Sequence, residues 1–258
     1  MKYWEVFREH NHYASSKWEH YIFIYEEILK KYVEKGKPVN VLEVGVQNGG
    51  SLEILEKYLP KGSKIFGVDI CEKCSEIDFP ENIQCYVGDA SERNFWDNNL
   101  QDIKFDIIID DGSHKYKDII NAFTFLFYEK LNGGGLYLVE DLHTSYMKGF
   151  GGGLRKKGSS VEYFKNLIDS LNINYAKKRP LFPSKEFEEL KELNKHIKRI
   201  SFYDSICTIE KYNSVLKESF SACYTGECFT VTEPWGRSEV ISYKEKEERM
   251  SEVEKLFF

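Results

Sequence analysis

The chain has 258 residues, a hydrophobic fraction of 41% and a formal net charge of -6, which suffices for one sizeable core. The acidic balance argues against a nucleic-acid partner, because binding to nucleic acid requires a basic surface stripe. The apolar stretches are too short to cross a membrane, and the N-terminus lacks the apolar segment of a signal peptide. We therefore expect a cytoplasmic protein without a nucleic-acid or membrane partner.

Strand and helix signals alternate along most of the chain. Apolar runs predict buried strands at residues 39–44, 64–68, 83–87, 105–109 and 135–139. Amphipathic periodicity and stop signals predict helices at residues 18–33, 51–59, 92–98, 115–131, 160–171 and 242–256. A closing pair of strands is predicted at residues 197–203 and 206–211. Strands joined by helical crossovers indicate an α/β fold with a doubly wound parallel sheet, to which the closing pair adds an antiparallel strand.

We expect a single domain over residues 1–258, because the sequence contains no internal repeat and no second apolar core. Its central part covers residues 39–211, with an N-terminal helical extension at 1–38 and a polar C-terminal extension at 212–258.

The six cysteines do not form a disulfide framework of the kind found in small secreted proteins. Cys71 and Cys74 have the spacing of a zinc or redox pair, but Cys223 and Cys228 have four residues between them rather than two. We therefore expect reduced, unpaired thiols.

Two short acidic motifs directly follow predicted strands. They are Asp-Asp-Gly-Ser-His at residues 110–114 and Glu-Asp-Leu-His at residues 140–143. Because the carboxyl ends of parallel strands form the ligand crevice of such a sheet, these side chains should converge. Clustered carboxylates repel one another and are costly to bury without a cation. Oxygen ligands indicate magnesium, with calcium or manganese as alternatives; otherwise the acids only cap the following helices.

The turn after the first strand has the sequence Glu-Val-Gly-Val-Gln-Asn-Gly-Gly-Ser at residues 43–51. Its glycines let the backbone approach a ligand, and the next helix offers free N–H groups. Glu43 would repel a pyrophosphate but can face an ammonium or a sulfonium-bearing amino acid. Asp69 ends the second strand, where an acid can accept both hydroxyls of a ribose, and Asp89 ends the third, where it can accept from an adenine amino group.

These motifs resemble those of class I S-adenosylmethionine (SAM) methyltransferases. More narrowly, they resemble the metal-dependent sugar O-methyltransferases that act on macrolide deoxysugars and bacterial surface saccharides. The resemblance implies a Rossmann-like sheet of about seven strands, the last one antiparallel, with SAM and Mg²⁺ as cofactors. It assigns cofactor binding to Glu43, Gly45, Gln47, Gly49, Ser51, Asp69, Asp89, Ala90 and Asp110.

The resemblance also assigns the metal to Asp111, Glu140 and Asp141 and the general base to His114. This chemistry is reasonable, because a sugar hydroxyl is a weak acid that a metal can activate and a neutral imidazole can deprotonate.

Candidates for contacting the acceptor are His143, Tyr146 and Arg155. His143 has two alternatives, an ordinary core or surface residue or a partner of a metal ligand. The glycine- and lysine-rich segment at residues 147–158 is interpreted either as a lid over the acceptor or as a solvated loop.

We expect a homo-oligomeric enzyme that methylates a sugar hydroxyl on a free sugar, a nucleotide sugar, a glycoside or a capsule-type saccharide. One alternative is a catechol-type methyltransferase, which an aromatic-lined pocket would favour. The other is a metal-dependent oxygenase of the cephalosporin hydroxylase-like type, in which His114 and His143 would be ligands beside one carboxylate.

Overall fold

The structure, a computed structural model, describes residues 1–176, 184–218, 220, 223–224, 230, 241–242 and 247–258. Its strands are β1 (Asn40–Val44), β2 (Lys64–Asp69), β3 (Ile83–Val87), β4 (Phe105–Asp110), β5 (Leu131–Val139), β6 (Ile197–Phe202), β7 (Cys207–Lys211), β8 (Cys223–Tyr224) and β9 (Ile241–Ser242). Within the described ranges, no helix combines the length and the apolar composition that a membrane crossing requires.

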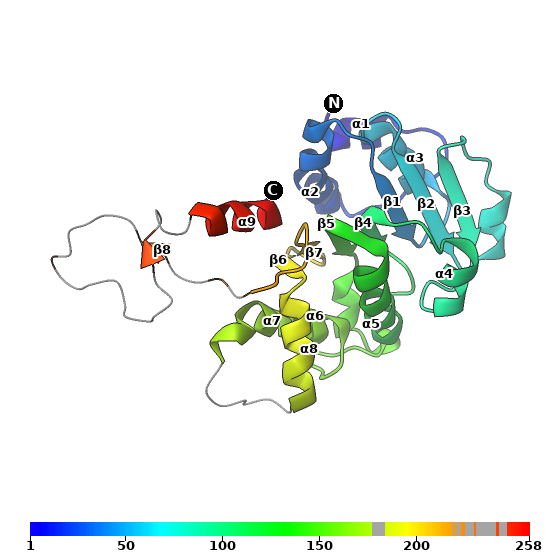
Figure 1. Ribbon diagram of the computed structural model, residues 1–258. Helices are drawn as coiled ribbons and strands as arrows, with labels where there is room; N and C mark the ends of the chain where they lie inside the picture. The colour runs from blue at the N-terminus through cyan, green and yellow to red at the C-terminus, as the bar shows by residue number, and fades with distance from the viewer. Residues whose placement is uncertain (177–183, 219, 221–222, 225–229, 231–240, 243–246) are drawn as a thin grey trace.

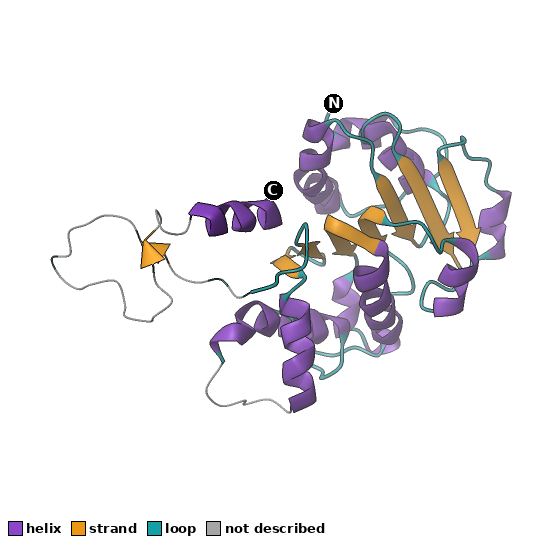
Figure 2. Ribbon diagram, viewed as in Figure 1, coloured by secondary structure: helices purple, strands orange, loops and turns teal. Residues whose placement is uncertain are grey.

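The helices are distributed along the whole chain (Figure 2). The α-helices are α1 (Tyr3–Glu9), α2 (Glu19–Lys35), α3 (Gly50–Tyr58), α4 (Arg93–Asn99), α5 (Tyr116–Phe125), α6 (Ser160–Asn166), α7 (Ile168–Asn172), α8 (Ser184–Asn194) and α9 (Glu247–Phe257). The short helices are η1 (Glu72–Glu76), η2 (Leu126–Lys130), η3 (Leu142–Tyr146), η4 (Lys148–Phe150) and η5 (Ile173–Tyr175).

Seven strands form one sheet in the order β3-β2-β1-β4-β5-β7-β6 (Figure 1). The first five are parallel, and β7 is antiparallel to both β5 and β6. The predicted doubly wound sheet of seven strands with an antiparallel last strand is therefore confirmed. The closing pair adds two strands rather than a single edge strand, because β7 enters between β5 and β6.

Both faces of the sheet are covered, which explains why its central strands are apolar at successive positions. Val41 packs with α1, α2 and α3 on one face, whereas Leu42 packs with α4, α5 and α6 on the other. On β4, Ile107 and Ile108 divide in the same way. The N-terminal helices therefore belong to the layer that covers one face of the sheet.

Several elements differ from those expected. Helix α1 and helix α8 were not predicted, and the predicted helix at residues 115–131 ends earlier. It passes from α5 into the π-helical turn η2, and β5 begins at Leu131 because that residue pairs with Phe105 across an irregularity in the register. At the other end of the chain, the carbonyl of Leu256 in α9 accepts the N–H of Asn213 at 3.2 Å.

Helix α2 offers a test of how far the N-terminal layer stabilises the fold. Leu29 is 0% exposed and Phe23 on the same helix is 63% exposed. We expect Leu29→Ala to lower the free energy of unfolding by ~2–5 kcal/mol, because it leaves a cavity against the sheet. Phe23→Ala should change it by less than ~0.5 kcal/mol. Urea denaturation of both variants checks this, and equal effects would show that α2 is not part of the core.

Candidate functional site

The candidate site lies at the carboxyl edge of the sheet, where β1, β4 and β5 end beside one another. The acids that directly follow these strands are thereby brought to one edge. A cleft of about 1420 Å³ opens there, and its wall includes Asp69, Asp89, Asp111, His114 and Asp141. This cleft unites most of the residues expected to bind the cofactor with those expected to do the chemistry.

Gly45 ties the turn after β1 to the first acidic motif. Its φ is +94°, and a Cβ at this position would lie 2.2 Å from the carbonyl oxygen of Asp111. A side chain at residue 45 would therefore displace the acid loop itself. In the same turn Gln47 has a φ of 52° and lines the cleft, whereas Gly49, with a φ of 86°, packs its backbone against the ring of Phe79.

Asp69 braces this turn from β2. Its Oδ2 accepts the backbone N–H groups of Val46 and Gln47 at 2.8 and 2.9 Å. Its Oδ1 accepts the N–H of Cys71 at 2.8 Å. Asp69 lines the cleft as expected for a ribose partner, and it also holds the two loops that form the cofactor side of the cleft.

Asp89 and Ala90 lie on the cleft wall after β3. Oδ1 of Asp89 accepts the N–H and the hydroxyl of Ser91 at 2.8 and 2.7 Å. The carbonyl of Ala90 accepts the indole N–H of Trp96 at 3.0 Å. One oxygen of Asp89 is thus committed to shaping its own loop.

Glu43 lies beneath the cleft rather than on its wall. It is 0% exposed, and the hydroxyl of Ser51 donates to its Oε1 at 2.8 Å. Among the described residues its Oε2 has no hydrogen-bond partner. Burial raises the pKa of Glu43 to about 7, although Lys17 opposes the shift. The ammonium that Glu43 faces in this structure is that of Lys17, at 3.7 Å.

Asp110 is also buried at the end of β4. The hydroxyl of Tyr137 donates to its Oδ2 at 3.2 Å. Burial raises the pKa of Asp110 to about 7, with the N–H of Gly112 and the hydroxyl of Tyr137 acting in the opposite direction. Two of the acids in this region therefore differ from ordinary surface carboxylates.

Asp111, His114 and Asp141 form the group of the described residues that can hold a metal ion, with ligand atoms within 4.8 Å of one another. His114 Nε2 lies 3.5 Å from Oδ2 of Asp141 and 3.9 Å from Oδ1 of Asp111. The two carboxylates suit a divalent ion that prefers oxygen ligands, such as Mg²⁺ or Mn²⁺, and the imidazole lies directly beside them. His114 and Asp141 have φ values of 57° and 53°, and such left-handed backbone is rarely adopted by non-glycine residues outside functional sites.

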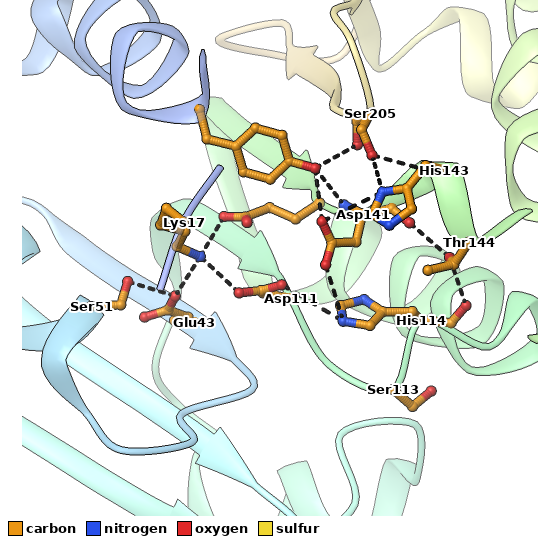
Figure 3. A network of polar contacts seen from close by, with 12 residues as sticks. Lys17, Glu43, Ser51, Asp111, Ser113, His114, Asp141, His143, Thr144 and Ser205 are labelled. Carbon is orange, nitrogen blue, oxygen red and sulfur yellow. Dashed lines mark hydrogen bonds and ion pairs between the residues drawn. The ribbon is translucent and has the colours of Figure 1, made fainter. Parts of the chain in front are cut away.

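Glu140, the third ligand expected, lies outside that group and is bound to Lys17. The Lys17 ammonium donates to Oε1 of Glu140 and to Oδ2 of Asp111, both at 2.7 Å (Figure 3). Burial opposes the charge of Lys17, but Glu140, Asp111 and Glu43 raise its pKa well above the ordinary value. Burial also raises the pKa of Glu140. One ammonium faces three carboxylates, so if all three are ionised the group carries an excess of negative charge that a bound cation would offset.

Two tyrosines of α2 complete the contacts between the N-terminal helices and the acids. The hydroxyl of Tyr25 donates to Oε1 of Glu140. The hydroxyl of Tyr21 donates to Oδ1 of Asp141 at 2.8 Å. Each of the three acids expected to bind metal therefore has a partner from residues 17–25.

The three residues expected to contact the acceptor are not equally placed. His143 lies beside the metal group, with Nδ1 at 2.6 Å from Oγ of Ser205 and 3.7 Å from Oδ1 of Asp141. None of the three lines the cleft of the described structure, and Tyr146 and Arg155 are exposed. His143 thus has the position of a ligand's partner, one of the alternatives left open by the sequence.

The glycine-rich segment after η3 is held to the body of the protein by its backbone. The N–H groups of Gly152 and Gly153 donate to the carbonyls of Met147 and Ser145, at 2.9 and 2.8 Å. The segment also brings the ring of Phe150 to 6.4 Å from that of His114. It forms part of the surroundings of the candidate base.

The cysteines Cys71, Cys74, Cys85 and Cys207 are free thiols, as expected. The side chains of Cys223 and Cys228 lie outside the described residues.

Lys17, Tyr21, Tyr25 and Ser205 are the site residues that the sequence reasoning missed. Lys17 stands in a stretch without a motif, and the two tyrosines belong to an amphipathic helix that a core packing role explains. The helical spacing of Tyr21 and Tyr25, four residues apart, is the available signal that both lie on one face.

No family model matches the chain. It is 31% identical over 214 residues to the 8-demethyl-8-alpha-L-rhamnosyl tetracenomycin-C 2'-O-methyltransferase of Streptomyces olivaceus, covering 77% of this chain and 52% of that protein. It is 35% identical over 158 residues to the mycinamicin VI 2''-O-methyltransferase of Micromonospora griseorubida, covering 57% and 38%. The chain thus spans about half or less of the length of these relatives.

Solved structures show the same relationship. The MycE methyltransferase of the mycinamycin biosynthetic pathway, in complex with Mg and SAH, aligns with a TM-score of 0.71 and 27% identity. That alignment covers 84% of this chain and 56% of the other. A second crystal form gives a TM-score of 0.63 with 30% identity, over 74% and 48%.

The sheet order and the acid-lined cleft define a class I methyltransferase fold. The comparisons narrow the relationship, and over its matched part the chain is related to the metal-dependent sugar O-methyltransferases of this class. The resemblance drawn from the motifs is thereby confirmed.

Asp110 gives the candidate site a pH dependence. The folded protein holds a proton on Asp110 up to about pH 7, whereas the unfolded chain loses it near pH ~4. The contribution of Asp110 to stability therefore falls as the pH rises through this window. Asp110→Asn, which keeps the shape without the charge, should raise Tm at pH 8 by at least ~2 °C and leave it unchanged near pH 4. An equal Tm difference at both pH values, measured by calorimetry, would contradict this.

Proposed function

We propose that this protein is a SAM-dependent O-methyltransferase that transfers a methyl group to a sugar hydroxyl with the help of Mg²⁺. The observation that carries the proposal is that Asp111 and Asp141, two of the acids expected to bind the metal, and His114, the expected base, stand together in the same cleft as the glycine turn and Asp69. The relatives named above support the reaction, because their names describe O-methylation of sugars. The match to these relatives covers about half of their length or less. The reaction of the whole protein is therefore part of the proposal.

The cofactor would occupy the side of the cleft lined by Gly45, Gln47, Asp69, Asp89 and Ala90. Asp69 and Asp89 are the candidates for the ribose and the adenine. The buried Glu43 lies under this side and would act through the turn that it holds, whereas the buried Asp110 is part of the cleft lining.

Asp111 and Asp141, with Glu140 as the third expected ligand, would hold the metal. When bound, a divalent ion there lowers the pKa of a coordinated hydroxyl and orients it. His114 takes the proton at Nε2 as the new C–O bond forms. The hydroxyl of Thr144 lies 2.7 Å from the carbonyl of Asp141 and 3.3 Å from that of His114, between the backbones of these two residues.

The acceptor proposed is the sugar of a glycoside, in line with the tetracenomycin and mycinamicin acceptors named for the relatives. Nucleotide sugars and capsule-type saccharides are the other classes to test. The oxygenase alternative is less well supported, because the metal group of the described residues contains one histidine and His143 is engaged by Ser205. Oligomeric state and cellular location stay predictions.

The direct test is to incubate the protein with SAM, Mg²⁺ and a panel of glycosides, nucleotide sugars and catechols, with mass spectrometry of the products. We expect a methylated glycoside and an equal amount of S-adenosylhomocysteine. Methylation of catechols alone would favour the catechol-type enzyme, and a hydroxylated product would overturn the proposal.

If His114 is the base, His114→Asn should lower kcat by ~10²–10⁴ and leave SAM affinity, measured by calorimetry, nearly unchanged. His196→Asn, a change at the start of β6 and outside the cleft lining, should retain the wild-type rate. Single-turnover rates and metal content are measured on the same preparations. A folded His114→Asn enzyme with at least a third of the wild-type rate would remove the base from the mechanism.

A substitution at Asp141 distinguishes the metal site from the cofactor site. Asp141→Asn should abolish turnover and weaken Mn²⁺ binding at least ~100-fold, because a ligand charge is lost, while SAM still binds. Asp169→Asn, an exposed acid on α7, is the matched control. Chelator-treated wild-type enzyme should be inactive and recover with Mg²⁺; full activity in excess chelator would exclude a metal role.

A further inference from the structure

Lys17 contacts the proposed metal site through oxygens other than those that face His114. The Lys17 ammonium donates to Oδ2 of Asp111, whereas Oδ1 of the same carboxylate faces Nε2 of His114. Figure 3 shows Lys17 and His114 on either side of Asp111. The carboxylate therefore stands between a fixed internal cation and the candidate base.

This contact differs from an ordinary surface ion pair. The side chain of Lys17 is 4% exposed, and those of Glu43 and Glu140 are 1% and 2% exposed. A lysine buried to this extent loses its hydration, which only close carboxylates can offset. Interactions between such groups are also stronger and less screened than at the surface.

The backbone that carries Lys17 is itself held in place. Ahead of it, Nδ1 of His12 lies 2.8 Å from Oε1 of Glu53, and the N–H of Tyr13 donates to Oε2 of Glu53 at 3.2 Å. The carbonyl of Tyr13 lies so near Gly50 that a Cβ there would come within 2.2 Å of it. After Lys17 the chain enters α2. The ammonium is thus delivered by a segment that is fixed at both ends.

We propose that Lys17 is a positioning residue that confines the divalent ion to the oxygen of Asp111 facing His114 and Asp141. Lys17 does so by occupying Oδ2 of Asp111 and Oε1 of Glu140 with its own charge, which leaves Oδ1 of Asp111 and Oε2 of Glu140, beside Asp141, to the ion. Without this ammonium, the two carboxylates would draw the ion deeper between them, where it binds more tightly but lies farther from the base. The inference rests on the proposed function, because it concerns the metal of that same site.

The test compares Lys17→Met, which keeps the length but not the charge, with Lys17→Arg, which keeps the charge. Lys30→Met is the matched control, since Lys30 on α2 is 66% exposed and pairs with Glu34 at the surface. Mn²⁺ binding is titrated by electron paramagnetic resonance, without SAM or acceptor. We expect Lys17→Met to bind Mn²⁺ at least ~tenfold more tightly than the control, because a repelling unit charge is gone.

Lys17→Arg should stay within ~threefold of the control in Mn²⁺ affinity, because the charge is retained. In the methylation assay, Lys17→Met should lose at least ~100-fold in kcat, because base and activated hydroxyl are no longer aligned. Its KM for SAM should change little, and saturating Mn²⁺ should not restore the rate. A purely structural lysine would instead lower the folded fraction and leave the Mn²⁺ affinity of the folded protein unchanged.

A folded Lys17→Met protein with equal or weaker Mn²⁺ affinity than the control would overturn the proposal. If that variant does not fold, acetylation footprinting of the wild-type protein decides: Lys17 must remain protected when Mn²⁺ is added, and exposure on metal binding would overturn it. If Lys17→Met binds Mn²⁺ more tightly as predicted but the wild-type protein methylates no sugar, the proposed activity alone is refuted. Normal turnover of Lys17→Met with unchanged Mn²⁺ affinity would refute the role of Lys17 alone.

Discussion

The repulsion among carboxylates at one edge of the sheet is the constraint on which the rest of this structure depends. Neighbouring parallel strands end side by side, so the acids at the ends of β1, β4 and β5 are forced together. Lys17 relieves part of this repulsion by contacting Asp111 and Glu140. The remainder is met by burial that favours the protonated forms of Glu43 and Asp110. The repulsion at this edge is thus reduced in two ways, by a buried positive charge and by conditions that favour protonated carboxyl groups.

The backbone of the loops at this edge also has unusual conformations. Gln47, His114, Asp141 and Ser205 all have positive φ values, and each lies in a loop at this edge. Such conformations are kept only when surrounding contacts require them. Here Asp69 accepts N–H groups from the turn that contains Gln47, and Tyr21 donates to Asp141. The side chains that bring the acids together therefore also hold the loops in their unusual conformations.

The sheet could be predicted from the sequence because its central strands are apolar on both faces, and the strand-end acids could be predicted because they directly follow those strands. Helix α1 could not, since a seven-residue helix is stabilised by burial of Tyr3 and Val6 rather than by its own signals. The position of Lys17 in the site could not be predicted either. A lysine in a segment without periodicity gives no indication that the fold will bury it among acids that lie far along the chain. Tyr146 and Arg155 were chosen for their chemistry, but the course of the backbone leaves them outside the cleft lining.

The site draws on segments that are distant in sequence, since Lys17 and Tyr21 come from the beginning of the chain and Ser205 from the turn between the last two strands of the large sheet. Contacts between segments so distant in sequence form late in folding, because the loop that they close is long. During synthesis the ammonium of Lys17 emerges before the acids that it will neutralise. The acid loops of β4 and β5 therefore have all of these partners only when the N-terminal layer is docked, which couples the completion of the binding cleft to the packing of that layer.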